Sequence, residues 1–306
     1  MKLAVPDLIS NSYFPAVAAA ELGFFKREGL DVTVELIAPA GRTYEAMRDG
    51  EVEFVAAEAH AGLAAFPGWR GMKFVCALSQ GMYWFLVMRP DLAGARGDLS
   101  VVRGRRIAAA PWVDLGLKRL LQAAGIDIER DKVTIAPLQK SLERKSNTGV
   151  IAAQALKDGT IDGFWANGMG AELAVRRGAG TIVLDVRRGD GPPAAFGYTL
   201  PTLAVADRVL QKDPEVAGAA QRAIANTLTA LKEDISLATK VGEKIFPSEE
   251  ASLIAELVRR DLPYYDPALS HASIASLNQF GRDVGILLGY PSYKDMVAAP
   301  VPVPAK

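Results

Sequence analysis

The chain has 306 residues, half of them apolar and 23% charged, which excludes a disordered chain and suits two globular domains better than one core. Lysine plus arginine and aspartate plus glutamate balance at 35 each, which argues against nucleic-acid or anionic-membrane partners. The single cysteine, Cys76, cannot form an internal disulfide, and no apolar run approaches the roughly 20 residues of a membrane span.

The N-terminus gives no sign of a secretory signal. Met1 and Lys2 lead directly into an apolar strand, and Asp7 and Asn11 interrupt any apolar signal core. We therefore expect either a cytoplasmic protein or a mature chain whose signal peptide was removed and replaced by methionine. The sequence leaves both compartments open.

The stretch from Leu3 to Glu58 alternates strand and helix signals, and the stretch from Ile107 to Trp165 repeats its plan. Four glycines stand where a helix is expected to end in a left-handed residue, which glycine adopts without Cβ strain. They are Gly29, Gly50, Gly125 and Gly159. Two βαβαβ units predict two similar α/β lobes, with a ligand in the crevice at the carboxyl ends of the strands.

The elements are expected in the following order along the chain. Strands are predicted at 3–5, 32–37, 54–58, 73–78, 84–88, 107–110, 133–136, 163–164, 181–186 and 198–205. Helices are predicted at 14–25, 44–48, 60–66, 114–123, 150–156 and 171–177. After Asp207 three further helices are predicted, at 217–231, from Ser248 onward and at 270–288. A frayed tail is expected at 298–306. The breaker-rich segment 187–193 is expected to return the chain to the first lobe.

Several segments together resemble one family of proteins. They are Tyr13-Phe14-Pro15-Ala16, Glu21-Leu22-Gly23-Phe24-Phe25, Gly29-Leu30-Asp31-Val32, Ala46 to Phe54, Ala77-Leu78-Ser79-Gln80-Gly81, Val102 to Ile107, and Ala155 to Asp162. In this order they resemble the nitrate/sulfonate/taurine and thiamine-precursor group of substrate-binding proteins. The resemblance covers nearly the whole chain.

The resemblance implies an α/β, two-lobed type-2 periplasmic-binding-protein fold. Each lobe is then a mainly parallel sheet flanked by helices, and two hinge strands join the lobes. We expect lobe I at 1–85 and 195–306, lobe II at 86–194, and the ligand cleft between them. A relative with this fold makes the thiamine pyrimidine in the cytosol, but its cysteine- and histidine-rich stretch is absent here, where only Cys76, His60 and His271 occur.

Candidate ligand-binding residues in lobe I follow its strands or lie in the resembling segments. Asn11 and Tyr13 precede a helix, where the polar groups either cap it or contact an anion. Arg42 either clamps a carboxylate or sulfonate or is solvated. Glu58 and His60 either bind an amine or ring nitrogen or stand at an ordinary helix start with His60 exposed. Ser79 and Gln80 belong to the matching Ala77 to Gly81 run.

In lobe II the candidates are Trp112, Asp114, Asn147, Thr148, Trp165 and Asn167. Asp114 and the 146–149 segment suit helix caps whether or not they contact a ligand. Trp112 departs from the small polar residues of related anion binders and favours a flat ligand. The alternatives are that Trp165 is a lobe-packing residue, or that both tryptophans pack inward and the crevice is small and polar. Replacing Trp112 with alanine is expected to weaken binding at least tenfold, roughly 1.4 kcal/mol.

These features predict a monomeric solute-binding protein that captures a small aromatic or heterocyclic acid or amine for the permease of an ABC importer. The resemblance implies a periplasmic location. No cofactor or metal is expected, since two distant histidines and one cysteine give no ligand spacing. The alternatives are a sensor without transport, or a cytoplasmic decarboxylase or pyrimidine-forming enzyme with Glu58 or Asp114 as base and His60 as its partner.

Overall fold

The computed structural model describes residues 1–298, and within them the strands form two five-stranded sheets. The first has the order β2-β1-β3-β10-β4. Its strands are β1 (Lys2–Val5), β2 (Thr33–Leu36), β3 (Phe54–Glu58), β4 (Met72–Ala77) and β10 (Pro201–Ala206). β1 pairs in parallel with β2 and β3, whereas β10 is antiparallel to both β3 and β4.

The second sheet has the order β7-β6-β8-β5-β9. Its strands are β5 (Phe85–Met88), β6 (Arg106–Ala109), β7 (Thr134–Ala136), β8 (Gly163–Ala166) and β9 (Thr181–Asp185). β6 is parallel to β7 and β8, and β5 is antiparallel to β8 and β9. In each sheet one strand runs against the other four, which confirms the prediction of two mainly parallel sheets.

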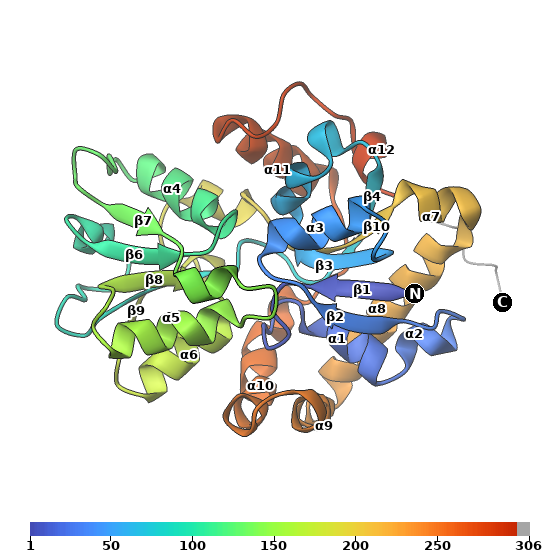
Figure 1. Ribbon diagram of the computed structural model, residues 1–306, viewed down its shortest axis with the longest axis horizontal. Helices are drawn as coiled ribbons and strands as arrows, with labels where there is room; N and C mark the ends of the chain where they lie inside the picture. The colour runs from blue at the N-terminus through green and yellow to red at the C-terminus, as the bar shows by residue number, and fades with distance from the viewer. Residues whose placement is uncertain (299–306) are drawn as a thin grey trace.

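The chain passes between the two sheets twice, once between β4 and β5 and once between β9 and β10. We call the first sheet with the helices around it lobe I, and the second sheet with α4, α5 and α6 lobe II (Figure 1). The exact residue boundaries proposed for the lobes stay a prediction.

The helices of the two βαβαβ units end where the glycine pattern predicts. Gly29, Gly50, Gly125 and Gly159 all have φ between +69° and +85°, a range that disfavours any side chain with a Cβ. The helices are α1 (Phe14–Glu21), α2 (Phe24–Arg27), α3 (Ala40–Arg48), α4 (Val113–Ala123), α5 (Thr148–Lys157) and α6 (Gly168–Arg176).

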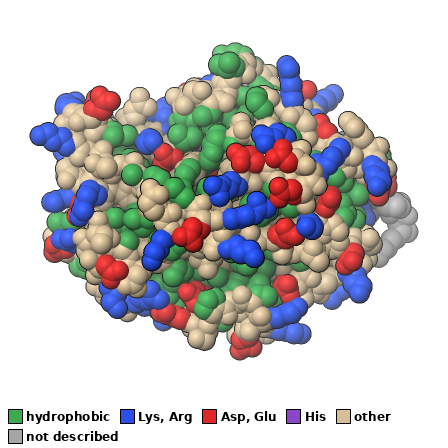
Figure 2. Space-filling view, in the orientation of Figure 1, with side chains coloured by type: hydrophobic (Ala, Val, Ile, Leu, Met, Phe, Trp, Pro, Cys, Tyr) green, Lys and Arg blue, Asp and Glu red, His purple; other side chains and the backbone are tan. Residues whose placement is uncertain are grey.

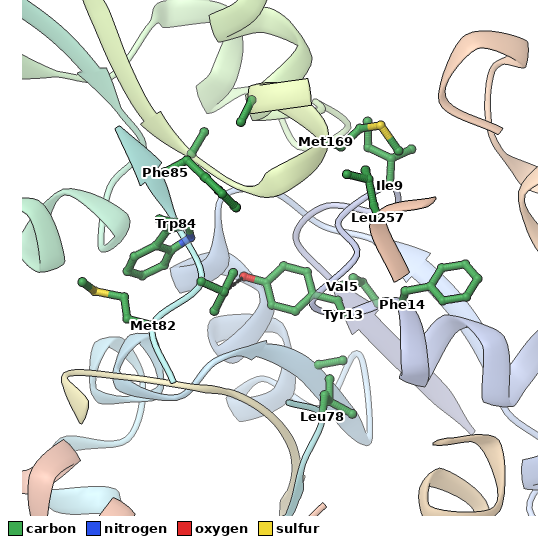
Figure 3. Packing of buried hydrophobic residues seen from close by; sticks show 14 of the residues in the cluster. Val5, Ile9, Tyr13, Phe14, Leu78, Met82, Trp84, Phe85, Met169 and Leu257 are labelled. Carbon is green, nitrogen blue, oxygen red and sulfur yellow. Dashed lines mark hydrogen bonds between the residues drawn. The ribbon is translucent and has the colours of Figure 1, made fainter. Parts of the chain in front are cut away.

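The rest of the described chain after β10 is helical. It forms α7 (Asp207–Lys212), α8 (Glu215–Glu233), α9 (Ser236–Ile245), α10 (Ser248–Asp261), α11 (His271–Asp283) and α12 (Tyr293–Met296). α10 packs on α6 of lobe II as well as on α9. Figure 3 shows Leu257 of α10 beside Ile9 and Met169, three buried residues of one apolar cluster that spans both lobes.

Four predicted details need correction. The helix expected at 14–25 is interrupted by Gly23 with φ +76°, and the one expected at 60–66 is a 3-10 helix at Ala59–Ala64. The last long helix ends at Asp283, since Gly285 has φ +76°. Asp114 is not an N-cap, because α4 begins at Val113. Apart from residue 298, the predicted tail at 298–306 lies outside the residues that the structure describes.

The surface carries both signs of charge. On the face in Figure 2 the Lys and Arg side chains are interspersed with Asp and Glu, and small apolar areas lie between them. Among residues 1–298, no helix is both long enough and apolar enough to cross a bilayer.

Candidate ligand-binding site

A cavity of about 40 Å³ lies between the lobes and takes its walls from both. Since one water needs on the order of 10–15 Å³, the cavity has room for only a few waters. It is lined by Pro6, Asp7, Tyr13, Pro39, Ala40, Glu58, Trp84, Ala110, Val113, Thr148, Gly149, Trp165, Ala166 and Asn167.

The topology explains why these residues meet. Most of them lie at or just after the carboxyl ends of β1, β3, β6 and β8, or at the start of the helices α3, α4, α5 and α6, whereas Tyr13 precedes α1 and Trp84 precedes β5. No side chain caps α3, α4 or α5. Because the first N–H groups of a helix have no intrahelical partner, these ends offer hydrogen-bond donors to whatever lies in the cavity.

Glu58 is the most enclosed polar group of the cavity, with 0% of the residue exposed. The Tyr13 hydroxyl donates to Glu58 Oε2 at 2.6 Å, and it also contacts the Tyr83 hydroxyl. Glu58 Oε1 is buried without a hydrogen-bond partner. Burial raises the pKa of Glu58 to about 7, although the Tyr13 hydrogen bond lowers it. The carboxyl thus has one oxygen held and one free to accept from a ligand.

Asp7 is the second buried carboxyl group and is tied to the opposite lobe. Asn167 Nδ2 donates to Asp7 Oδ2 at 2.7 Å, and the Ile9 N–H donates to Oδ1 at 3.1 Å. Asn167 also caps α6 by accepting from the Gly170 N–H. Burial raises the pKa of Asp7 to about 7 in spite of these hydrogen bonds. One hydrogen bond therefore joins the lobes inside the cavity wall.

Three aromatic side chains supply the apolar walls. Tyr13 comes from lobe I, Trp165 is the penultimate residue of β8, and Trp84 precedes β5 on the segment that joins the lobes. The two indoles are tilted at 60° with their ring centres 6.1 Å apart. Figure 3 shows the Tyr13 hydroxyl end pointing toward the segment that carries Trp84. Trp165 Nε1 is buried without a partner, so it is available as a donor.

The sequence reasoning missed Trp84 and Asp7. From the sequence, Trp84 is the first residue of a predicted strand, and Asp7 only interrupts the apolar N-terminal segment. The usable signal was position, because both stand beside a strand end of the predicted crevice.

All the ionisable groups of the cavity wall are acidic. Its ionisable groups are Asp7, Glu58 and Tyr13, and none of the lining residues is lysine, arginine or histidine. Within residues 1–298 no group of three or more His, Cys, Asp or Glu could hold a metal ion. The side chains of this wall suit a ligand with hydrogen-bond donors better than an anion.

Five predicted candidates line the cavity: Tyr13, Glu58, Thr148, Trp165 and Asn167. The proposed contact of each with a ligand stays a prediction. The other eight lie elsewhere, and their surroundings are as follows.

His60 and Trp112 meet at the rim between the lobes. His60 Nδ1 is 2.9 Å from Thr199 Oγ1, and Nε2 is 2.8 Å from the Trp112 carbonyl oxygen. His60 is wholly buried, so the alternative of an exposed imidazole is wrong. Burial lowers its pKa to about 4. The Trp112 indole is close to Gly41 of α3, with Nε1 only 2.7 Å from where a Cβ on Gly41 would stand.

Asn11, Ser79 and Gln80 belong to a buried polar network where the two crossing segments meet. Arg187 donates to Asp261 at 2.8 Å, to Ser79 Oγ at 2.8 Å and to the Gln80 carbonyl at 3.0 Å. Asn11 Nδ2 donates to the same Asp261 carboxylate at 2.5 Å. These contacts hold the hinge region together.

The last three candidates are not brought into the cavity wall. Arg42 is exposed on α3. Asp114 pairs with Lys118 one turn along α4 at 2.5 Å. Asn147 precedes α5, and its Oδ1 is buried without a partner.

Comparison with known families gives one match, described as NMT1/THI5 like, over residues 10–234. The chain belongs to the NMT1/THI5-like family. A comparison with curated protein sequences finds no match.

Solved structures share the fold at low sequence identity. The alkanesulfonate-binding protein SsuA from Xanthomonas axonopodis pv. citri, bound to MOPS, is 14% identical with a TM-score of 0.70, covering 97% of this chain and 96% of its own. The periplasmic nitrate-binding protein NrtA from Synechocystis PCC 6803 is 14% identical with a TM-score of 0.63, covering 81% and 68%. The desulfurization enzyme DSZB is 14% identical with a TM-score of 0.66, covering 98% and 96%.

These likenesses confirm the predicted fold, that of the two-lobed periplasmic binding proteins. Since fold and function are separate questions, the role of this chain has to be argued from its own cavity.

Proposed function

We propose that the protein captures a small organic ligand between its lobes and delivers it to the permease of an ABC importer. The observation that carries this proposal is the cavity between the lobes, because two of its lining residues each have a buried polar atom without a partner, Glu58 Oε1 from lobe I and Trp165 Nε1 from lobe II. Named binding proteins of the same fold, SsuA and NrtA, support the role.

The proposed ligand is flat and carries at least one hydrogen-bond donor, as an amine or an amino-substituted heterocycle does. Glu58 Oε1 accepts from the donor, while Trp165 Nε1 and the uncapped ends of α4 and α5 donate to ring nitrogens or carbonyl oxygens. The indoles of Trp84 and Trp165, tilted at 60° to each other, line one side of the cavity and cover one face of the ligand, and such an aromatic contact contributes about 0.5–1.5 kcal/mol beyond burial. Nitrate or a sulfonate fits less well, because Asp7 and Glu58 would repel it.

Ligand entry requires the lobes to separate, since the closed cavity of about 40 Å³ is smaller than a ring-sized molecule. Separation breaks the Asn167–Asp7 hydrogen bond, the bond between the His60 ring and the Trp112 carbonyl, and that from the Ala38 N–H to the Arg144 carbonyl at 2.8 Å. We therefore propose hinge closure about the two crossing segments as the functional motion.

An enzymatic role is the second candidate, and one observation favours it. Glu58 has a pKa of about 7 in an enclosed site, as a general base requires, and DSZB is an enzyme of this fold. The predicted partner His60 is instead held by Thr199 and Trp112, and Asp114 is paired with Lys118. Binding without turnover is the better-supported proposal.

Compartment and assembly follow from the transport role. We propose a monomer exported to the periplasm, where the permease is its partner, without nucleic-acid binding, membrane insertion or a cofactor. Size-exclusion chromatography with light scattering tests the first point.

The test of the function is a calorimetric ligand screen. Flat amines and amino-substituted heterocycles are compared with nitrate and short alkanesulfonates at pH 7.5. We expect micromolar or tighter binding within the first group and none within the second, with the compound recovered unchanged after prolonged incubation. Binding confined to the anions would refute the ligand class, and conversion of the compound would favour the enzyme.

A further inference from the structure

Tyr83 stands behind the cavity and does not line it. It belongs to the segment between β4 and β5, one of the two that join the lobes, and only 2% of it is exposed. Its hydroxyl contacts the Tyr13 hydroxyl, which in turn donates to Glu58 Oε2 at 2.6 Å. Tyr83 thus reaches the ligand site through another residue.

The direction of the hydrogen bonds follows from counting protons. A neutral tyrosine has one O–H proton, and that of Tyr13 is given to Glu58. While Glu58 is ionised and accepts that proton, Tyr83 therefore donates to Tyr13. The chain of hydrogen bonds runs from the segment between β4 and β5 to the carboxylate, and each bond in such a chain strengthens the next by about 10–30%.

Packing holds the Tyr83 ring in place. It meets the Tyr13 ring edge-on, with centres 5.7 Å apart and planes at 79°. The guanidinium of Arg187, from the other crossing segment, lies 5.6 Å from the centre of the Tyr83 ring. Both crossing segments therefore fix the position of one hydroxyl group.

We propose that Tyr83 is a positioning residue of the ligand site: through Tyr13 it holds the Glu58 carboxylate so that Oε1 faces the ligand. This proposal rests on the proposed function in one respect, that a ligand donates a hydrogen bond to Glu58. The arrangement of the three side chains stands without it.

Among the side chains around Glu58, the tyrosine pair is the feature that favours its ionised form. Burial raises the pKa of Glu58, while the Tyr13 hydroxyl and the backbone of Glu58 itself lower it by hydrogen bonding. Tyr44 of α3 touches the Glu58 backbone carbonyl at 3.2 Å, not the carboxylate. Arg187 lies behind Tyr83, and His60 is turned to Thr199 and Trp112. Asp7, the other acid of the cavity wall, is bonded to Asn167.

The experiment is a pH titration of Glu58 in ligand-free protein, followed by NMR of carboxyl-¹³C-labelled glutamate and assigned by the signal lost in Glu58→Gln. We expect Tyr13→Phe to raise the titration midpoint by about one pH unit and Tyr83→Phe by a few tenths of a unit. Tyr44→Phe is the matched control, since it removes the same atom from an equally buried ring, and it should leave the midpoint unchanged.

The double variant Tyr13→Phe/Tyr83→Phe decides whether Tyr83 acts through Tyr13. We expect it to titrate like Tyr13→Phe alone. An unmoved midpoint in Tyr83→Phe, or equal shifts in Tyr83→Phe and Tyr44→Phe, would overturn the proposal. Because no ligand is present, a protein that binds nothing in the calorimetric screen can still give these shifts, so the two proposals fail separately.

Discussion

The two walls of the cavity differ in chemistry. Lobe I contributes Asp7 and Glu58, two buried carboxyl groups, whereas lobe II contributes an indole, a threonine and an amide. We propose from this difference that the lobes have separate tasks. In this proposal lobe I supplies the acceptors that select a ligand with donors, and lobe II supplies a flat surface and donors that close over it.

The largest effect should come from removing the acceptor of lobe I. Glu58→Gln keeps the shape of the side chain but replaces a charged acceptor with an amide, which we expect to weaken ligand binding about 100-fold, or about 2.7 kcal/mol. Calorimetry measures this loss. Arg42→Ala, on the exposed face of α3, is the control and should bind normally. Equal losses in both variants would remove Glu58 from the site.

Lowering the pH should weaken ligand binding through the carboxyl groups of lobe I. Since burial raises the pKa values of Glu58 and Asp7 to about 7, lowering the pH below 7 protonates the acceptors. For a ligand whose own charge is constant and whose binding requires Glu58 alone to be ionised, affinity should fall about tenfold per pH unit between 6.5 and 4.5. Binding that is flat over this range in wild-type protein would contradict the role of the carboxyl groups.

The stability of the ligand-free protein should change with pH in the opposite sense to its affinity for the ligand. Unfolded Asp and Glu lose their protons near pH 4, while the folded chain keeps protons on Asp7 and Glu58 until about pH 7. Between these values the folded state binds more protons, so these groups make the ligand-free protein less stable as pH rises. Thermal melts from pH 5 to 8 should show a steeper decline for wild type than for Glu58→Gln.

A smaller effect is expected from the wall of lobe II. Trp165→Phe keeps an aromatic face but removes Nε1, the unpartnered donor. We expect binding to weaken about tenfold, the cost of roughly one hydrogen bond. Trp69→Phe, whose Nε1 donates to Asn278 far from the cavity, is the matched control. If Trp165→Phe binds the ligand as tightly as wild type, the indole N–H is not a donor to the ligand and the ring serves only as an apolar wall.

The smallest effect should come from the rim. Trp112→Ala removes the ring packed near Gly41 but leaves the carbonyl oxygen that meets His60. Since the ring lies outside the cavity wall, we now expect only a twofold to threefold loss, through faster opening. Stopped-flow measurement of ligand release tests this. A tenfold loss of affinity with an unchanged rate of ligand release would instead support the direct contact between Trp112 and the ligand that the sequence predicts.

The sequence allowed the fold to be predicted because its signals are local. Gly29, Gly50, Gly125 and Gly159 mark helix ends by their own backbone preference. The site was harder, since it depends on how two lobes face each other. Glu58 and Trp165 could be found from strand ends, but His60, two residues past Glu58, turns to Thr199 from a distant segment. Trp84 stands on the hinge, where no local pattern marks a ligand contact.

The most direct test is native mass spectrometry of freshly purified wild-type and Glu58→Gln protein, after incubation with the extract of the cells that produced them. The account predicts that wild type retains a nitrogen-containing, ring-sized molecule and that Glu58→Gln retains little or none of it. Retention of an inorganic anion or a sulfonate, equal retention by both proteins, or no retained molecule in wild type would contradict it.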